Sequence, residues 1–203
     1  MAHAKHKSAA YLGFFLLPNI NRSDARQDSE VKVGLQADNK HITAKAKASM
    51  AGPGVSGTAV FTEYDVDGWK YVHVRLTLHG DPKTLQAGKH AVHIHEKGDC
   101  ECDGFKCAGG HFDPGSAGNT DPDANHGYHA GDLPSITVDK EGHGELETIT
   151  TRVTLSDGPV SILQPAEGTS LMVHANPDPY TSGESGSGHS GGPRLACGRI
   201  EKA

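Results

Sequence analysis

The sequence predicts an all-β fold, a β-sandwich or a β-barrel whose strands are interrupted by two long functional loops. Short runs of alternating apolar and polar residues, or runs rich in β-branched and aromatic residues, recur along the chain, and helix-forming patterns are scarce. Turn sequences separate these runs, such as DVDG at residues 65–68 and DKEG at residues 139–142. The number of runs suits a sandwich or a barrel.

The expected strands fall into two groups along the chain. The first group lies at residues 41–49, 58–64, 70–79 and 90–95. The second group lies at residues 135–138, 144–155, 160–163, 170–174 and 195–200. Runs of this kind, bounded by Gly, Pro, Asp and Ser, are typical of strands.

Two connections between these strands, residues 96–134 and 175–194, are long for a compact domain. Loops of such length are usually functional or disordered. The first connection is rich in His, Asp and Cys, so we expect it to carry function. The second contains TSGESGSGHSGG, a Gly/Ser stretch whose His189 we interpret as solvated.

Composition indicates one modest domain at residues 41–203. The chain has 203 residues, of which 35% are hydrophobic, with 26 Gly and 11 Pro. No apolar run approaches the roughly 20 residues that cross a bilayer, so we expect no membrane span. The net charge of −6 disfavours nucleic acid as a partner, and an anionic substrate would need a local positive site.

Residues 1–40 resemble a secretory signal followed by a flexible N-terminal arm. A basic head precedes a short apolar stretch at residues 9–17, although a clean A-x-A cleavage site is missing. A disordered arm with a few apolar residues is the alternative. Export would place the protein in the periplasm or outside the cell.

The four cysteines, which allow three pairings, are expected to form disulfides. Export favours disulfides, whereas a cytosolic location would favour thiolate ligands for a metal. The sequence has no CxxC pair, and the Cys-x-Cys spacing is poor for a zinc finger.

Residues 89–100 read KHAVHIHEKGDC and place three histidines in one expected strand. Side chains alternate along a strand, so His93 and His95 point to one face and His90 points to the other. Two imidazoles on one face can chelate a metal ion. His90 needs a separate explanation, and a buried structural role is the simplest.

Further candidate ligands follow the HxH pair. They are His111 in GGHFDPG, His126, His129 and Asp132 in HGYHAGDLP, and His174 in SLMVH. Each has an ordinary structural reading on its own, such as a turn cap for Asp132. Together, imidazole and carboxylate groups suit copper and zinc.

Five motifs in order, HAVHIHEKGDC, AGGHFDPG, HAGDLPSITV, TSLMVHANPD and GGPRLACGRI, resemble the signature stretches of copper,zinc superoxide dismutases. The resemblance covers about residues 55–200. It implies an eight-stranded Greek-key β-barrel and an enzyme with copper and zinc as cofactors. The implied reaction converts superoxide to O₂ and H₂O₂ as copper cycles between Cu(II) and Cu(I). Family members are monomers or dimers, so a homodimer is possible.

The resemblance also assigns residues to the copper site. His93, His95 and His174 would hold copper, and His111 would bridge copper to zinc through its two ring nitrogens. Arg194 resembles the arginine that guides superoxide to copper, and Asp178 resembles the carboxylate that orients metal-bound imidazoles.

The implied zinc site is incomplete. His111, His129 and Asp132 match family ligands, but the histidine expected midway between the first two is replaced by Asn119-Thr120-Asp121. His126 is our choice for the missing ligand, and a water or Asp121 is the alternative. A copper-only dismutase with a degenerate zinc site, or a non-catalytic copper-binding domain, therefore stays open beside the two-metal enzyme.

The resemblance pairs two of the cysteines. Cys197 in RLACG resembles the family cysteine whose disulfide anchors the loop beside copper, and Cys100 resembles its bacterial-type partner. Cys102 and Cys107 remain, and they could close a small second ring if geometry permits.

Overall fold

The computed structural model describes residues 39–115, 118–124 and 128–203. The expected signal-like segment at residues 1–38 therefore lies outside the described residues. Strands and loops make up nearly all of the described chain. The strands are β1 (Lys40–Gly52), β2 (Val55–Val66), β3 (Trp69–Gly80), β4 (Gly88–His95), β5 (Asp132–Val138), β6 (His143–Thr150), β7 (Ser170–His174), β8 (Arg194–Arg199) and β9 (Glu201–Lys202). One 3₁₀ helix, η1 (Asp103–Ala108), interrupts the first long loop. No helix in the described residues has the length and hydropathy of a membrane span.

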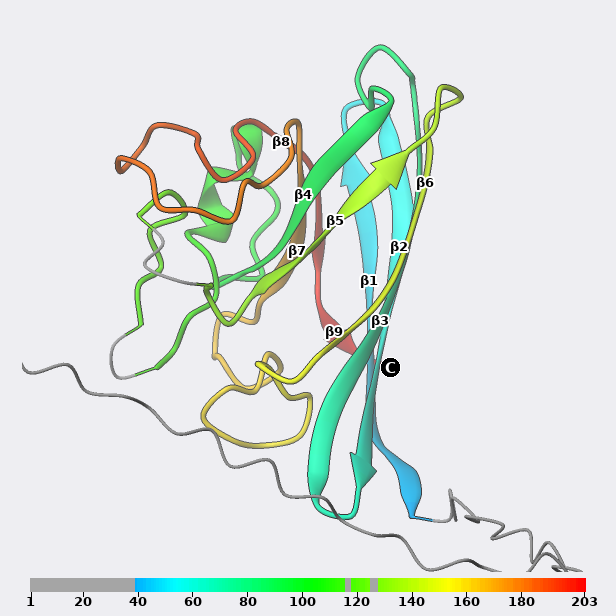
Figure 1. Ribbon diagram of the computed structural model, residues 1–203, viewed down its shortest axis with the longest axis vertical. Coiled ribbons are helices and arrows are strands. Elements are labelled where there is room, and N and C mark those ends of the chain that lie inside the picture. The colour runs from blue at the N-terminus through cyan, green and yellow to red at the C-terminus, as the bar shows by residue number, and fades with distance from the viewer. Residues whose placement is uncertain (1–38, 116–117, 125–127) are drawn as a thin grey trace, which may run out of the picture. The chain divides into compact units, whose positions relative to one another are not determined.

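The strands form a closed antiparallel barrel with Greek-key connections (Figure 1). Their order is β2-β3-β6-β5-β4-β7-β8-β1, and pairing of β1 with β2 closes the barrel. The chain passes from β3 to β4 across the positions of β5 and β6, which is the Greek-key feature. The predicted eight-stranded barrel is confirmed, and the two-residue β9 only extends the edge of β1.

Two expected strands differ from the structure. The expected strand at residues 160–163 is absent, since the only sheet contact there is an isolated bridge between Thr154 and Ser161. The preceding strand ends at Thr150 instead of residue 155. Apolar residues in this segment, such as Val153 and Ile162, are buried in the barrel core without strand pairing, so hydrophobicity alone gave the wrong prediction.

The barrel interior follows the period of two in the sequence. Ala46, Ala48 and Met50 of β1 are buried and alternate with exposed residues. On β4, Val92 and Ile94 point into the same core. Each such apolar side chain contributes about 1.5–3 kcal/mol when it is fully buried. The alternation on β4 leaves the intervening side chains on the outer face of the barrel wall, beneath the long loops.

The first long loop is fastened back onto β4 by its backbone. Phe112 N donates to Ile94 O at 2.8 Å, and Ile94 N donates to Gly131 O at 2.8 Å. An isolated antiparallel bridge also pairs His95 with His111. The loop therefore returns to the barrel wall on both sides of its irregular middle, and it brings its own histidines to those of β4.

Two disulfides stabilise the chain. Cys100 is joined to Cys197 on β8, with 97 residues of separation, which is the pairing that the family resemblance implies. Cys102 is joined to Cys107 with a separation of 5. The large ring ties the first long loop to the last main strand, and the small ring encloses most of η1.

Glu63 is a fully buried carboxylate at one end of the barrel. It accepts hydrogen bonds from Leu155 N at 2.6 Å, Ser156 N at 3.1 Å and Thr43 Oγ1 at 2.5 Å. Burial alone would raise the pKa of Glu63, but these hydrogen bonds outweigh it and hold the pKa below its usual value. The charged form therefore stabilises the turn that follows β6.

Replacing Glu63 with Gln should lower the free energy of unfolding at pH 7 by about 1–3 kcal/mol, because buried backbone N–H groups lose a charged acceptor. Since the folded pKa is depressed, this contribution is present above the unfolded-state pKa of Glu and is lost as pH falls through the folded value. Urea unfolding between pH 3 and pH 7 would measure both effects. Glu147→Gln, on an exposed ion pair with Arg75, is the matched control and should change stability much less. Equal losses in the two variants would contradict this role for Glu63.

Removing the Cys100–Cys197 bridge by double Ser substitution should lower the free energy of unfolding by about 4–5 kcal/mol, since the bridge closes a long loop in the unfolded chain. The same change at Cys102 and Cys107 should cost only about 2 kcal/mol, because that loop is short. Denaturant unfolding measures both values. Non-reducing peptide mapping that found Cys102 or Cys107 bonded to Cys197 would overturn the pairing itself.

Candidate metal centre

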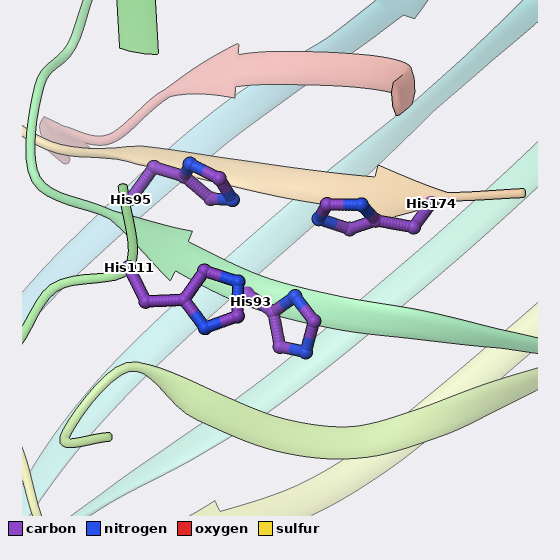
Figure 2. A group of neighbouring side chains, drawn as sticks. All are labelled: His93, His95, His111 and His174. Carbon is purple, nitrogen blue, oxygen red and sulfur yellow. The ribbon is translucent and has the colours of Figure 1, made fainter. Parts of the chain in front are cut away.

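Four buried histidines meet on the outer face of the barrel wall, beneath the loops (Figure 2). His93 and His95 come from β4, and His174 is the last residue of the neighbouring strand β7. His111 comes from the first long loop through its bridge to His95. The centroid of the His93 ring lies 3.9 Å from that of His111 and 4.8 Å from that of His174. We call these four residues the histidine cluster.

Each of three cluster rings uses one nitrogen for a hydrogen bond that fixes its orientation. His93 Nε2 donates to Asp178 Oδ2 at 2.7 Å. His95 Nδ1 donates to Gly109 O at 3.0 Å, and His174 Nδ1 donates to Gly192 O at 3.1 Å. Such contacts are the usual support of metal-binding imidazoles, because they set the tautomer and aim the other nitrogen.

One nitrogen of each cluster ring is buried without a hydrogen-bond partner among the described residues. These atoms are His93 Nδ1, His95 Nε2, His111 Nε2 and His174 Nε2. One nitrogen from each of the four rings lies within 4.8 Å of the others. Unpartnered buried polar atoms are costly, so four of them converging on one space fit a bound metal ion.

Burial keeps three of these histidines, His95, His111 and His174, neutral. It lowers the pKa of His95 and His174 well below the usual histidine value, and the neighbouring imidazoles lower it further. Burial also lowers the pKa of His111 to about 4. Neutral imidazole is the form that binds metal, so the site is ready for an ion at neutral pH.

A second cluster shares His111 with the first. His111 Nδ1 lies 2.8 Å from Asp132 Oδ1, and His129 Nδ1 lies 3.3 Å from Asp132 Oδ2. The two Nδ1 atoms are 3.2 Å apart. We call His111, His129 and Asp132 the carboxylate cluster. Two imidazole nitrogens converging on one buried carboxylate also fit a metal ion.

The charges of the carboxylate cluster are coupled. Burial raises the pKa of Asp132, but hydrogen bonds with His111 and His129 outweigh it, so the carboxyl stays ionised. Burial lowers the pKa of His129, yet Asp132 raises it above the usual value. Asp132 thus keeps a negative charge beside the histidine cluster.

The missing ligand of the carboxylate cluster is not supplied by Asp121. Its Oδ1 accepts hydrogen bonds from Asp123 N at 3.0 Å and Ala124 N at 3.2 Å, and its Oδ2 accepts one from Ser185 Oγ. These bonds hold a turn and fasten the second long loop. His126, the other candidate, lies outside the described residues.

His90 lies apart from both clusters, as its odd spacing predicts. It is buried, and its Nδ1 and Nε2 lie 2.8 Å from His174 O and 2.7 Å from Gln86 O, respectively. The histidine therefore ties β4 to the end of β7 from the other side. His90 helps to hold the strands that carry the histidine cluster, but it is not a member of the cluster.

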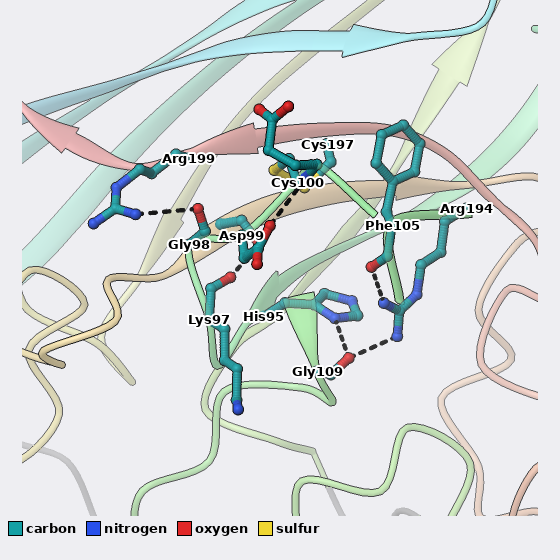
Figure 3. Close-up of a disulfide and its surroundings, with 12 residues drawn as sticks. His95, Lys97, Gly98, Asp99, Cys100, Phe105, Gly109, Arg194, Cys197 and Arg199 are labelled. Carbon is teal, nitrogen blue, oxygen red and sulfur yellow. Dashed lines mark hydrogen bonds between the residues drawn. A yellow bond between two sulfur atoms is a disulfide. The ribbon is translucent and has the colours of Figure 1, made fainter. Parts of the chain in front are cut away.

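Arg194 shares a hydrogen-bond acceptor with the histidine cluster. Its Nη1 donates to Phe105 O and its Nη2 donates to Gly109 O, both at 2.6 Å (Figure 3). The carbonyl of Gly109 also accepts the hydrogen bond from His95. One main-chain oxygen therefore links the arginine to the histidine cluster.

Sequence reasoning missed these main-chain acceptors and one side chain. The sequence cannot show that the carbonyls of Phe105 and Gly109 are acceptors for Arg194, because every residue has a main-chain carbonyl. The missed side chain is Asp123, which is buried and accepts hydrogen bonds from Gly188 N and Ser190 N, both at 2.9 Å. Asp123 joins the two long loops, but an Asp in a polar loop does not by itself indicate such a role.

Comparison with known proteins agrees with this site. Residues 55–200 match the family model described as copper/zinc superoxide dismutase. The chain is 39% identical over 154 residues to a copper-zinc superoxide dismutase of Deinococcus radiodurans, covering 71% of this chain and 76% of that protein. It is 37% identical over 155 residues to one of Caulobacter vibrioides, covering 72% of this chain and 86% of that protein.

A solved structure shares the fold. The crystal structure of the clock protein EA4 is similar with a TM-score of 0.61 and 26% identity, covering 79% of this chain and 95% of that one. The matched residues 55–200 include the histidine cluster, the carboxylate cluster and Arg194. The chain belongs to the copper/zinc superoxide dismutase family.

Proposed function

We propose that this protein is a superoxide dismutase, an oxidoreductase that converts superoxide to O₂ and H₂O₂. His93, His95, His111 and His174 would hold copper, and His111, His129 and Asp132 would hold zinc. The observation that carries this proposal is the double role of His111, whose Nε2 belongs to the histidine cluster while its Nδ1 faces Asp132. Relatives named copper-zinc superoxide dismutase support the activity.

The donor atoms suit this choice of metals. Imidazole nitrogens bind copper well, and two imidazoles with a carboxylate are a common zinc set. When bound, copper supplies the one-electron couple that oxidises one superoxide and reduces the next. Zinc has no redox chemistry, and it would order the loop that carries His129.

The residues around copper would bind and orient the anion. The protein carries a net charge of −6, so superoxide needs a local cation, and the guanidinium of Arg194 is permanently charged and planar. Forming H₂O₂ also takes up protons. His111 would hold one at Nε2 whenever that nitrogen does not bind copper, because Nε2 has no hydrogen-bond partner among the described residues.

A copper-only dismutase is the second candidate. It is favoured by the carboxylate cluster, in which the described residues supply only three ligands. A non-catalytic copper-binding domain is disfavoured, because all four histidines of the copper set and Arg194 are present. Measuring copper and zinc per chain in the purified protein, together with dismutase activity, separates the three. One copper with no zinc and full activity would replace the two-metal proposal.

We also propose that the protein works in the periplasm or outside the cell. Two disulfides and a signal-like N-terminal sequence support an oxidising compartment. Superoxide would be the substrate, and a homodimer is possible. Fractionation of cells that express the full chain would test the location.

Replacing His93 or His95 with Ala should abolish both copper binding and dismutation, because each substitution removes a ligand nitrogen. His90→Ala should keep copper and mainly reduce stability, by about 1–3 kcal/mol, since it leaves buried carbonyls without donors. Copper content, activity and unfolding measured on the same samples test the difference. A folded His90→Ala variant without copper would show that the two faces of β4 are assigned wrongly.

His126→Ala should lower zinc content and melting temperature but leave copper bound and much of the activity intact, since zinc does not change oxidation state. His189→Ala is the matched control, because His189 is exposed and its Nε2 lies 2.9 Å from Thr181 Oγ1, away from both clusters. Metal analysis and calorimetry give the two readouts. Unchanged zinc affinity in His126→Ala would remove His126 from the site.

A further inference from the structure

We propose that the small disulfide ring of Cys102 and Cys107 positions Arg194, because the ring holds the carbonyl of Phe105 against the guanidinium. The inference rests on the dismutase function proposed above, since it concerns the residue that would receive superoxide. It gives a role to a disulfide that the metal sites themselves do not require. Phe105 is thus a positioning residue and acts through its main chain.

The orientation of Arg194 depends on two carbonyls. Nη1 donates to Phe105 O and Nη2 donates to Gly109 O, both at 2.6 Å (Figure 3). Two hydrogen bonds at the ends of a planar fork fix both its direction and its rotation, whereas one bond leaves the plane free to turn. Loss of either carbonyl would therefore loosen the cation without removing its charge.

The Phe105 carbonyl lies inside the small ring, where the backbone is strained. Gly104 and Phe105 have φ values of 63° and 55°, and Phe105 N donates to Cys102 O at 2.8 Å. A side chain with a Cβ disfavours positive φ, so the conformation of Phe105 needs an external constraint. The Cys102–Cys107 bridge supplies that constraint, since it closes the chain around this residue.

The second carbonyl is supported both by the ring, since Gly109 N donates to Lys106 O at 3.1 Å, and by contacts outside it. Gly109 adopts φ of 73°, and the next residue, Gly110, donates its N–H to Glu96 Oε1 at 3.0 Å. Gly109 O also accepts the hydrogen bond from His95. Opening the small ring should therefore displace Phe105 O more than Gly109 O, because Gly109 keeps its contacts with His95 and, through Gly110, with Glu96.

The test compares the purified full chain with its Cys102→Ser/Cys107→Ser variant. Nitrogen NMR of the Arg194 guanidinium, with copper reduced by ascorbate so that the disulfides survive, should show a larger shift of the Nη1 resonance than of the Nη2 resonance. Copper content should be equal in the two proteins. kcat/KM for superoxide should fall roughly tenfold, the effect of losing one hydrogen bond to a charged group.

A double-mutant cycle with Arg194→Lys shows whether the ring acts through the arginine. Lysine cannot reach both carbonyls as a planar fork, so opening the ring in that background should change kcat/KM little. An equal fall in the Arg194 and Lys backgrounds would overturn the inference. An unmoved Nη1 resonance in the folded Ser variant would overturn it too, whatever the activity. Failure of the proposed function is distinct, since it would appear as an inactive parent protein with copper fully loaded.

A second variant covers the case in which the Ser variant does not fold. Inserting one Gly between Gly104 and Phe105 keeps both disulfides but widens the small ring. The Nη1 resonance should again move while copper content stays constant. A folded insertion variant with unchanged Nη1 and unchanged kcat/KM would overturn the inference.

Discussion

The bridge between His95 and His111 is the contact on which the rest of the site depends. It fastens the first long loop to the end of β4 and places the His111 ring where the histidine cluster meets the carboxylate cluster. A histidine on a free loop would lose conformational entropy on binding each metal. Here that entropy is lost during folding. In the closed barrel β4 is paired with a strand on each side, so the position of β4, and of the loop bonded to it, is fixed.

The same arrangement would make the stability of the protein depend on a bound metal. Buried imidazole nitrogens without partners oppose folding, and they are concentrated where the histidine cluster meets the carboxylate cluster. An ion that binds only the folded chain would satisfy them and add to stability by mass action. The apolar barrel beneath β4 and the Cys100–Cys197 bridge do not depend on metal. They supply stability that holds the histidine cluster in one geometry.

Much of the fold and of the site could be predicted because it follows from the types of side chain and their spacing along the chain. The period of two separated His90 from His93 and His95, and the five ordered motifs implied the barrel and the Cys100–Cys197 pair. The segment at residues 160–163 could not be judged in the same way, since its apolar residues are buried without forming a strand. The carbonyls that accept hydrogen bonds from Arg194 could not be predicted either, because their positions depend on backbone conformation.

The two long loops act as one unit in the described part of the chain, and this explains how a chain without the expected mid-loop histidine keeps its site ordered. Asp121 and Asp123 accept hydrogen bonds from residues of the second loop, where a metal ligand was expected nearby. Gly183 N also donates to Asp123 O at 2.7 Å. These carboxylates reduce the conformational freedom of the Gly/Ser-rich loop. Hydrogen bonds between the two loops therefore provide part of the order that a zinc ion was expected to give the first loop. Asp178, which orients His93, lies at the start of that same loop, so the order of the loop bears directly on the histidine cluster.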